Sequence, residues 1–188
     1  MERRKVKINA LVLLVILCGL VKIAFADEYT RNAELMEQLE TGQLLCAEMP
    51  RDRECLFSIE NTDLTLPCYD TDGAHWQKTV DKKNSAAIIP FMDGTILIAD
   101  HCNQGFAVLR DVVPFGTHAY LTDSHGTATY ECVELIPDGV NNGDYLSEPG
   151  GRSVAWDFPC SLITYTCNEG KDADTITIAI WYRVPKEI

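Results

Sequence analysis

The chain is short of positive charge. Its 188 residues contain 16 Lys and Arg against 28 Asp and Glu, which gives a formal net charge of −12. Five of the basic residues and one acidic residue lie within positions 1–26, so the remainder keeps 11 basic and 27 acidic residues. Because phosphate binding needs a basic face, no nucleic-acid partner is expected. An acidic surface is typical of a soluble exported protein.

The sequence also lacks the spacings of a structural zinc site. It has no Cys-x-x-Cys pair and no two histidines separated by three to five residues, which are the common zinc-binding patterns. Internal repeats and low-complexity tracts are absent as well. The length that follows the N-terminal segment suits one domain with one core.

The first residues have the form of an export signal. A positively charged start at 3–7 precedes an apolar run at 8–21, and Ala-Phe-Ala at 24–26 gives the small-x-small pattern of a signal-peptidase site. This pattern predicts a cleaved signal peptide over 1–26. The alternative is an uncleaved membrane anchor, since about 20 apolar residues can span a bilayer. Lys22 shortens the run and favours cleavage.

Residues 27–55 are expected to form a short helix followed by a Cys-containing loop. The helix can begin at Thr30 and end at Gly42. Export makes disulfides plausible. A local disulfide between Cys46 and Cys55 is one interpretation, which the spacing alone does not establish.

Residues 56–188 show the short alternating runs of an all-β domain. Ser124-His125-Gly126 lies between two such runs and predicts a hairpin turn. Many short strands separated by turn formers indicate a sandwich or a barrel. The strands are expected at 56–59, 64–67, 95–99, 119–121, 128–135, 161–166 and 175–184, with a long polar loop at 137–159.

Seven cysteines follow the predicted signal, so three disulfides would leave one thiol over. Cys167 ends an expected strand and is the best candidate for that thiol. A cysteine nucleophile needs a nearby base or positive charge. His101 follows the buried run 95–99 and so emerges at a strand end, a common place for catalytic groups. The other histidines have no evident chemical role: His75, His118 and His125.

The order of these segments resembles the sortases, which are exported cysteine transpeptidases. Ile-Ala-Asp-His at 98–101, followed by Phe106 and Leu109, is similar to the family's histidine segment and the helical turn after it. Ile-Thr-Tyr-Thr-Cys at 163–167, whose cysteine follows His101 by 66 residues, is similar to the family's cysteine strand. The resemblance covers roughly 56–185. It implies a closed eight-stranded β-barrel over 56–188, with a short N-terminal helix before it.

The resemblance also implies a reaction. Cys167 would attack a peptide carbonyl in a peptide or protein sorting signal and form a thioacyl intermediate. His101 would act as acid and base, chiefly protonating the leaving amine. A cell-wall or protein amine, or water, would then resolve the intermediate. No metal or organic cofactor is needed, and the protein would be secreted or tethered by its N-terminus to the outer face of the membrane.

Two positions depart from the family pattern. Thr164 stands where leucine is usual, which we interpret as a change in packing. The family's arginine follows the cysteine by ten to thirteen residues, and positions 177–180 hold Thr, Ile, Ala and Ile. Arg183 would lie roughly 26 Å along the last strand from its start. The other candidate cations are Arg152 and Lys171, although lysine lacks the forked donor geometry of arginine.

Two rival hypotheses remain open at this stage. One is a non-catalytic barrel that binds a peptide or wall component, which the missing arginine favours. The other is an unrelated secreted binding domain held by disulfides. Cys102, beside His101, either forms a structural disulfide or pairs with Cys167 and stores the enzyme oxidised. The structural partners considered for Cys102 are Cys68, Cys132 and Cys160.

Overall fold

The computed structural model describes residues 33–71, 75–82, 84–91, 94–101, 105–143, 146–151, 153–168 and 174–185. The chain divides into two compact units, 1–41 and 42–188. The first contains the helical stretch 33–40. The predicted signal at 1–26 and the cap at Thr30 lie outside the described residues. Within the described ranges, no helix combines the length and apolar character needed to cross a bilayer.

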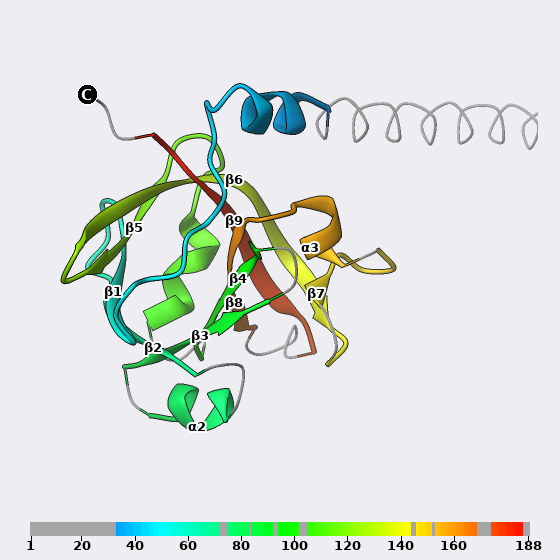
Figure 1. Ribbon diagram of the computed structural model, residues 1–188. Coiled ribbons are helices and arrows are strands. Elements are labelled where there is room, and N and C mark those ends of the chain that lie inside the picture. The colour runs from blue at the N-terminus through cyan, green and yellow to red at the C-terminus, as the bar shows by residue number, and fades with distance from the viewer. Residues whose placement is uncertain are drawn as a thin grey trace, which may run out of the picture. The chain divides into compact units, whose positions relative to one another are not determined.

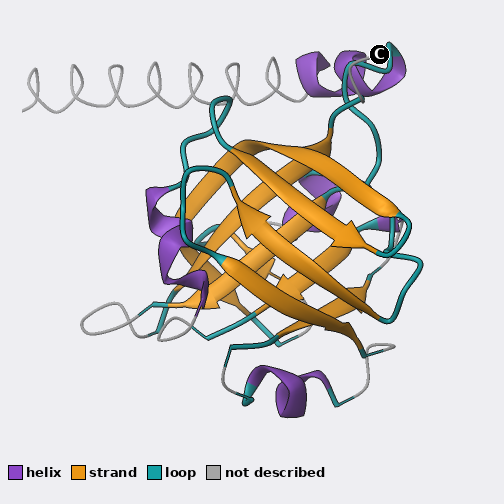
Figure 2. Cartoon of the chain, turned by 90° about the vertical axis from the view of Figure 1, so that its left-hand side faces the viewer, coloured by secondary structure: helices purple, strands orange, loops and turns teal. Residues whose placement is uncertain are grey.

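The second unit is a closed mixed β-barrel (Figures 1 and 2). Within the described residues, eight strands follow one another in the order β5-β1-β2-β3-β4-β8-β9-β6, and pairing of β5 with β6 closes the circle. This confirms the predicted eight-stranded barrel. The strands are β1 Glu54–Ile59, β2 Thr65–Asp70, β3 Ala86–Pro90, β4 Ile96–Ala99, β5 His118–Asp123, β6 Gly126–Asn141, β8 Leu162–Cys167 and β9 Ile176–Arg183.

The described residues of this unit also form three short helices and one further strand. The two-residue strand β7, Leu146–Ser147, pairs with the end of β6. Two pairings, β2 with β3 and β4 with β8, are parallel, and each needs a crossover connection. The helices are α2 Trp76–Val80, the 3-10 helix η2 Gly105–Asp111 and α3 Val154–Asp157.

Alternation along the strands fills the barrel with large apolar side chains. Phe57 of β1 packs edge-to-face against Phe106 of η2 and Trp181 of β9, and all three are fully buried. Ile98 of β4 and Leu162 of β8 belong to the same core. Edge-to-face rings add attraction beyond the area that they bury. This core fixes the strands on which the candidate site lies.

The prediction of a long loop at 137–159 is wrong. Strand β6 continues to Asn141, and β7 and α3 occupy much of the rest. Two irregularities in its pairing with β9 let β6 bend as it extends. Gly139 permits this course, because a Cβ there would lie 2.6 Å from the Ile178 side chain.

Residues 45–53, which we call the strap, run along the barrel and join it at several points. Leu45 exchanges backbone hydrogen bonds with Arg183 at the end of β9. The Arg51 amide donates to Asp123, and the Ser124 amide donates to Asp52. Because Asp123 also accepts the amides of the turn that follows it, its carboxylate fixes both the hairpin and the strap.

A disulfide joins the strap to the segment before β8. It links Cys46 to Cys160, 114 residues apart, with Cα atoms separated by 5.0 Å. The expectation of a local Cys46–Cys55 bond is therefore wrong. Cys55 lies on β1 with its side chain in the core and is paired in register with Cys68, and both are free thiols. Cys102 lies outside the described residues.

Loss of the disulfide should reduce stability strongly. A cross-link that closes a loop of this length restricts the unfolded chain and stabilises the fold by about 3 to 5 kcal/mol. We expect a Cys46→Ser/Cys160→Ser double variant to lose that amount in guanidinium denaturation. Reducing the wild type should cause a similar loss and leave the double variant unchanged. Equal stability of oxidised wild type and variant would contradict the bond.

Acid should loosen the strap. Hydrogen bonds from Ser124 hold the pKa of Asp52 below its usual range, and the Arg51 and His125 amides do the same for Asp123. A carboxylate with a lowered folded-state pKa stabilises the fold above its unfolded pKa, and this contribution is lost as pH falls through the folded value. Hydrogen-exchange protection of the Arg51 amide should therefore fall between about pH 5 and pH 2.

The variant Asp123→Asn provides the control. It removes the titrating charge, so protection of the Arg51 amide should already be low at neutral pH and should change little on acidification. Protection in the wild type that is the same at both ends of the pH range, after correction for intrinsic exchange, would refute the role of Asp123.

Candidate active site

Cys167 is the last residue of β8, at the rim of the barrel. Its thiol is free and exposed, whereas the preceding Thr166 and the following Asn168 are buried. The other described free cysteines, Cys55, Cys68 and Cys132, are buried. Burial raises the pKa of Cys68, and it raises the pKa of Cys132 to about 12, so both thiols stay protonated. Cys167 is thus the accessible thiol of the described chain.

His101 is brought to the same rim by the parallel pairing of β4 with β8. Ala99 pairs with Tyr165, and the Asp100 amide donates to the Tyr165 carbonyl. The observed register ends at Ala99 and Tyr165, and we infer from its continuation by two residues that His101 and Cys167 are neighbours. Neighbouring strands lie about 4.8 Å apart. Figure 1 shows β4 and β8 side by side.

The two side chains also share a face. Ile98 and Leu162 point into the barrel core, so residues one position away along each strand point outward. On the outward face, Leu97 of β4 with Ile163 and Tyr165 of β8 line a cavity of about 150 Å³. Alternation along β8 places Cys167 on this outward face, and His101 follows the end of β4 by two residues.

The cavity has a largely apolar lining with one phenol close to the thiol. Trp76, Phe91 and Val154 contribute from α2, the end of β3 and α3. Burial raises the pKa of Tyr165 to about 12, and the electrostatic effect of the neighbouring Cys167 contributes to the rise. Tyr165 therefore keeps its hydroxyl proton at neutral pH and remains a hydrogen-bond donor.

Asn168 holds the chain rigidly just after Cys167. The nitrogen of its side-chain amide donates to the Pro137 carbonyl at 2.8 Å and to the Thr175 hydroxyl at 2.7 Å. Its amide oxygen accepts from the Thr177 hydroxyl at 2.7 Å and from the Arg110 guanidinium at 3.2 Å. Arg110 of η2 thus brings a cation to the residue next to Cys167.

The candidate substitutes for the family arginine are placed differently. In the pairing of β8 with β9, the residue opposite Cys167 is Ile176, which is buried. Arg183 lies at the other end of β9, where its guanidinium pairs with Glu48 of the strap. Seven residues of extended chain separate Ile176 from Arg183, or roughly 23 Å. Arg152 and Lys171 lie outside the described residues.

The carboxylate of Asp81 contacts the histidine. Asp81 follows α2, and its Oδ1 lies 3.1 Å from Nε2 of His101. The Gln77 side-chain amide donates to the same carboxylate at 2.8 Å. These hydrogen bonds, first from Gln77 and then from His101, lower the pKa of Asp81. Asp81 is therefore an ionised acceptor at neutral pH.

Sequence reasoning missed both Asp81 and Arg110. Asp81 lies in a polar segment with no strand pattern, and only the fold brings it to His101. Arg110 follows Leu109 in the segment interpreted as an aromatic helical turn, so the sequence shows a cation there. No pattern in that turn indicated contact with Asn168, 58 residues away.

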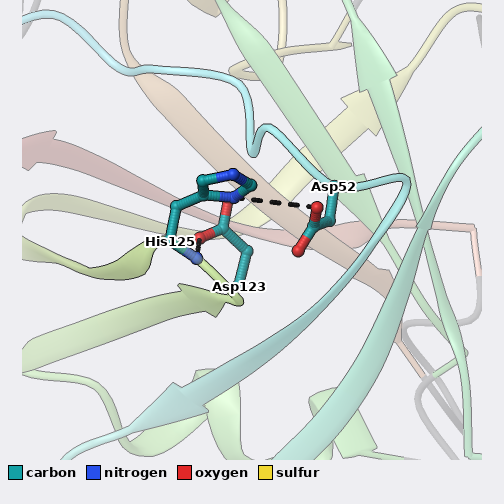
Figure 3. A group of neighbouring side chains, drawn as sticks. All are labelled: Asp52, Asp123 and His125. Carbon is teal, nitrogen blue, oxygen red and sulfur yellow. Dashed lines mark hydrogen bonds and ion pairs between the residues drawn. The ribbon is translucent and has the colours of Figure 1, made fainter.

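A larger cavity, of about 360 Å³, lies elsewhere. It is bounded by the strap and the β5–β6 hairpin, and its lining includes Glu48, His125 and Arg183. No cysteine is among the described residues that line it. Asp52, Asp123 and His125 cluster beside it (Figure 3). Backbone amides donate to both carboxylates, Ser124 to Asp52 and His125 to Asp123 among them, and these hydrogen bonds account for the two acidic side chains.

Solved structures identify the barrel, although no family model and no curated protein matches this chain. Sortase E1 from Streptomyces coelicolor superposes with a TM-score of 0.56 at 15% identity, covering 74% of this chain and 92% of its own. Pilus island 1 sortase C2 of group B Streptococcus gives 0.52 at 14% identity, over 84% and 97%. Sortase C-1 from Actinomyces oris gives 0.51 at 18% identity, over 81% and 84%. The barrel of this chain has a sortase-like fold.

Proposed function

We propose that this protein is an exported sortase-like cysteine transpeptidase or peptidase. The observation that supports the proposal is the pairing of β4 with β8, because β8 ends in a free, exposed thiol and His101 follows β4 by two residues. These strand ends continue an apolar cavity on the outer face of the same two strands. A thiol, a base and an adjoining apolar cavity are the parts that acyl transfer from a peptide requires.

The reaction follows from these positions. The Cys167 thiol proton moves to a ring nitrogen of His101, and the thiolate attacks the carbonyl carbon of the bound peptide. The protonated imidazole then gives its proton to the departing amine nitrogen, and the C–N bond breaks to leave a thioester on Cys167. An incoming amine, or water, attacks the thioester carbonyl and gives a proton to the now neutral His101, and the C–S bond breaks to release the Cys167 thiolate.

The apolar cavity beside Cys167 favours a peptide with apolar side chains near the cleaved bond. Leu97, Ile163 and Phe91 present apolar surface, and Trp76 adds an aromatic face. The similar sortase E1 structure has a tripeptide in its active site. A peptide sorting signal is the substrate class that this lining supports. The acceptor that we propose, on the basis of the structural similarity to sortases, is a cell-wall or protein amine.

Tyr165 is the donor that we assign to the developing oxyanion. The window ten to thirteen residues after Cys167, where the family has its arginine, holds Thr, Ile, Ala and Ile at 177–180, so charge on the carbonyl oxygen needs another donor. The Tyr165 hydroxyl stays protonated, lines the cavity and belongs to the residue two positions before Cys167 on the same face. A neutral phenol is a weaker donor than a guanidinium.

A second candidate function is peptide binding without turnover. The observation that favours it is the apolar Ile176 opposite Cys167, together with the placement of Arg183 at the far end of β9. In that case the cavity would still hold a peptide, and the wild type and a Cys167→Ala variant would bind it equally well without reaction.

The first test traps the thioester. We expect wild-type protein incubated with a peptide library to acquire an acyl adduct on Cys167, visible by mass spectrometry and removed by hydroxylamine. Cys167→Ala should abolish the adduct. His101→Ala should slow its formation by at least about a hundredfold, the usual contribution of a positioned acid–base group. Binding without any adduct would select the non-catalytic alternative.

The second test concerns the donor. Tyr165→Phe removes one hydroxyl and should reduce peptide cleavage by about tenfold or more, since oxyanion donors act on the transition state. Iodoacetamide develops no such oxyanion, so alkylation of Cys167 should be unchanged. Tyr120→Phe, on β5, is the matched control and should affect neither rate. Unchanged cleavage by Tyr165→Phe would remove the phenol from the mechanism.

A further inference from the structure

His101 has a partner on each side. The strand order β3-β4-β8 places it, at the end of β4, between the β3 side and the β8 side of the sheet. Cys167 ends β8. On the β3 side, the antiparallel register that joins Ala87 to Ala99 sets Ser85 opposite His101 when continued by two residues. Asp81 precedes Ser85 by four residues, and its Oδ1 lies 3.1 Å from Nε2 of His101.

The imidazole suits this position, because it has two nitrogens on different sides of the ring. When one nitrogen carries the proton, the other has a free lone pair. The hydrogen bond made by one nitrogen therefore sets the role of the other. With Nε2–H directed at Asp81, the lone pair of Nδ1 remains for a proton from the Cys167 side.

Asp81 is held in place by its own segment. Helix α2 packs against β3, and Val80 is buried at its end (Figure 1). The Ser85 hydroxyl lies 2.8 Å from the Thr79 carbonyl and 3.3 Å from that of Lys82, so it ties the chain together on both sides of Asp81. The Gln77 amide supports the carboxylate directly.

We propose that Asp81 is a positioning residue for His101 and completes a carboxylate–imidazole–thiol array with Cys167. Asp81 fixes the tautomer with the proton on Nε2. When the thiol proton passes to Nδ1, the resulting imidazolium faces the ionised carboxylate and is stabilised by it. The same proton later leaves with the amine. The role toward Cys167 rests on the proposed function, whereas the Asp81–His101 pair is independent of it.

The size of the effect follows from exposure. The His101 side chain is 33% exposed and that of Asp81 is 60% exposed, so water competes for both. Exposed charge pairs contribute little in general. We therefore expect removal of the carboxylate to slow alkylation of Cys167 near neutral pH by about two- to fivefold. An effect of that size tunes the site and does not create it.

The test compares four proteins: wild type, Asp81→Ala, Asp81→Glu and Asp63→Asn. Asp63 lies in the turn before β2, at the opposite end of that strand from α2, and its variant removes one acidic charge there. Two quantities are measured on each protein. One is the distribution of the ring proton of neutral His101 between Nδ1 and Nε2, from nitrogen-15 shifts. The other is the iodoacetamide rate of Cys167 across pH.

The expected result is a wild-type ring with its proton on Nε2. Asp81→Ala should mix the tautomers and slow alkylation, Asp81→Glu should restore part of both, and Asp63→Asn should change neither. A wild-type proton on Nδ1 overturns the proposal, and so do tautomers and rates that Asp81→Ala leaves unchanged.

Failure of the proposed function is separable from failure of this inference. If the wild type forms no thioester with any peptide but Asp81→Ala still changes the His101 tautomers, the positioning role stands and the enzyme assignment falls. If the wild type forms the thioester and Asp81→Ala changes nothing, only the positioning role falls. Circular dichroism of each variant checks that the barrel is intact.

Discussion

The candidate site depends on the parallel contact between β4 and β8. Parallel neighbours cannot be joined by a tight turn, so the chain between them must travel around the barrel and return. Here it builds η2, β5, β6, β7 and α3 on the way. His101 and Cys167 are therefore close to adjacent strands in the barrel but far apart in the sequence, with five elements between them.

The strands that could be predicted from the sequence were those with a clear apolar run or a clear alternation of apolar and polar residues. The run at 95–99 and the alternation at 175–184 predicted β4 and β9, because strands that bury a face carry that pattern along their whole length. Strand β3 was missed, since Ala-Ala-Ile-Ile-Pro is short and ends in a proline. The extension of β6 was missed because Pro137 and Gly139 are typical of loops, although Gly139 is required there by its contact with Ile178.

The site was only partly visible for a related reason. Cys167 and His101 each follow an apolar strand, so their places could be predicted from local pattern. Asp81 and Arg110 take their places from contacts across the fold, with His101 and with Asn168. No local signal reports such contacts. The Cys46–Cys160 bond is another example, because cysteine spacing indicates which bridges are possible and the topology selects among them.

The disulfide must stay oxidised, whereas the proposed nucleophile Cys167 must stay reduced. Cys46 is exposed and Cys160 is partly so, which leaves the bond open to small thiols. Cys167 is exposed as well, and an exposed free thiol is open to oxidation. Reductant that preserves the proposed nucleophile thus attacks the link between the strap and the entry to β8. The protein is best suited to a redox potential low enough to spare a lone thiol and high enough to keep one bridge closed.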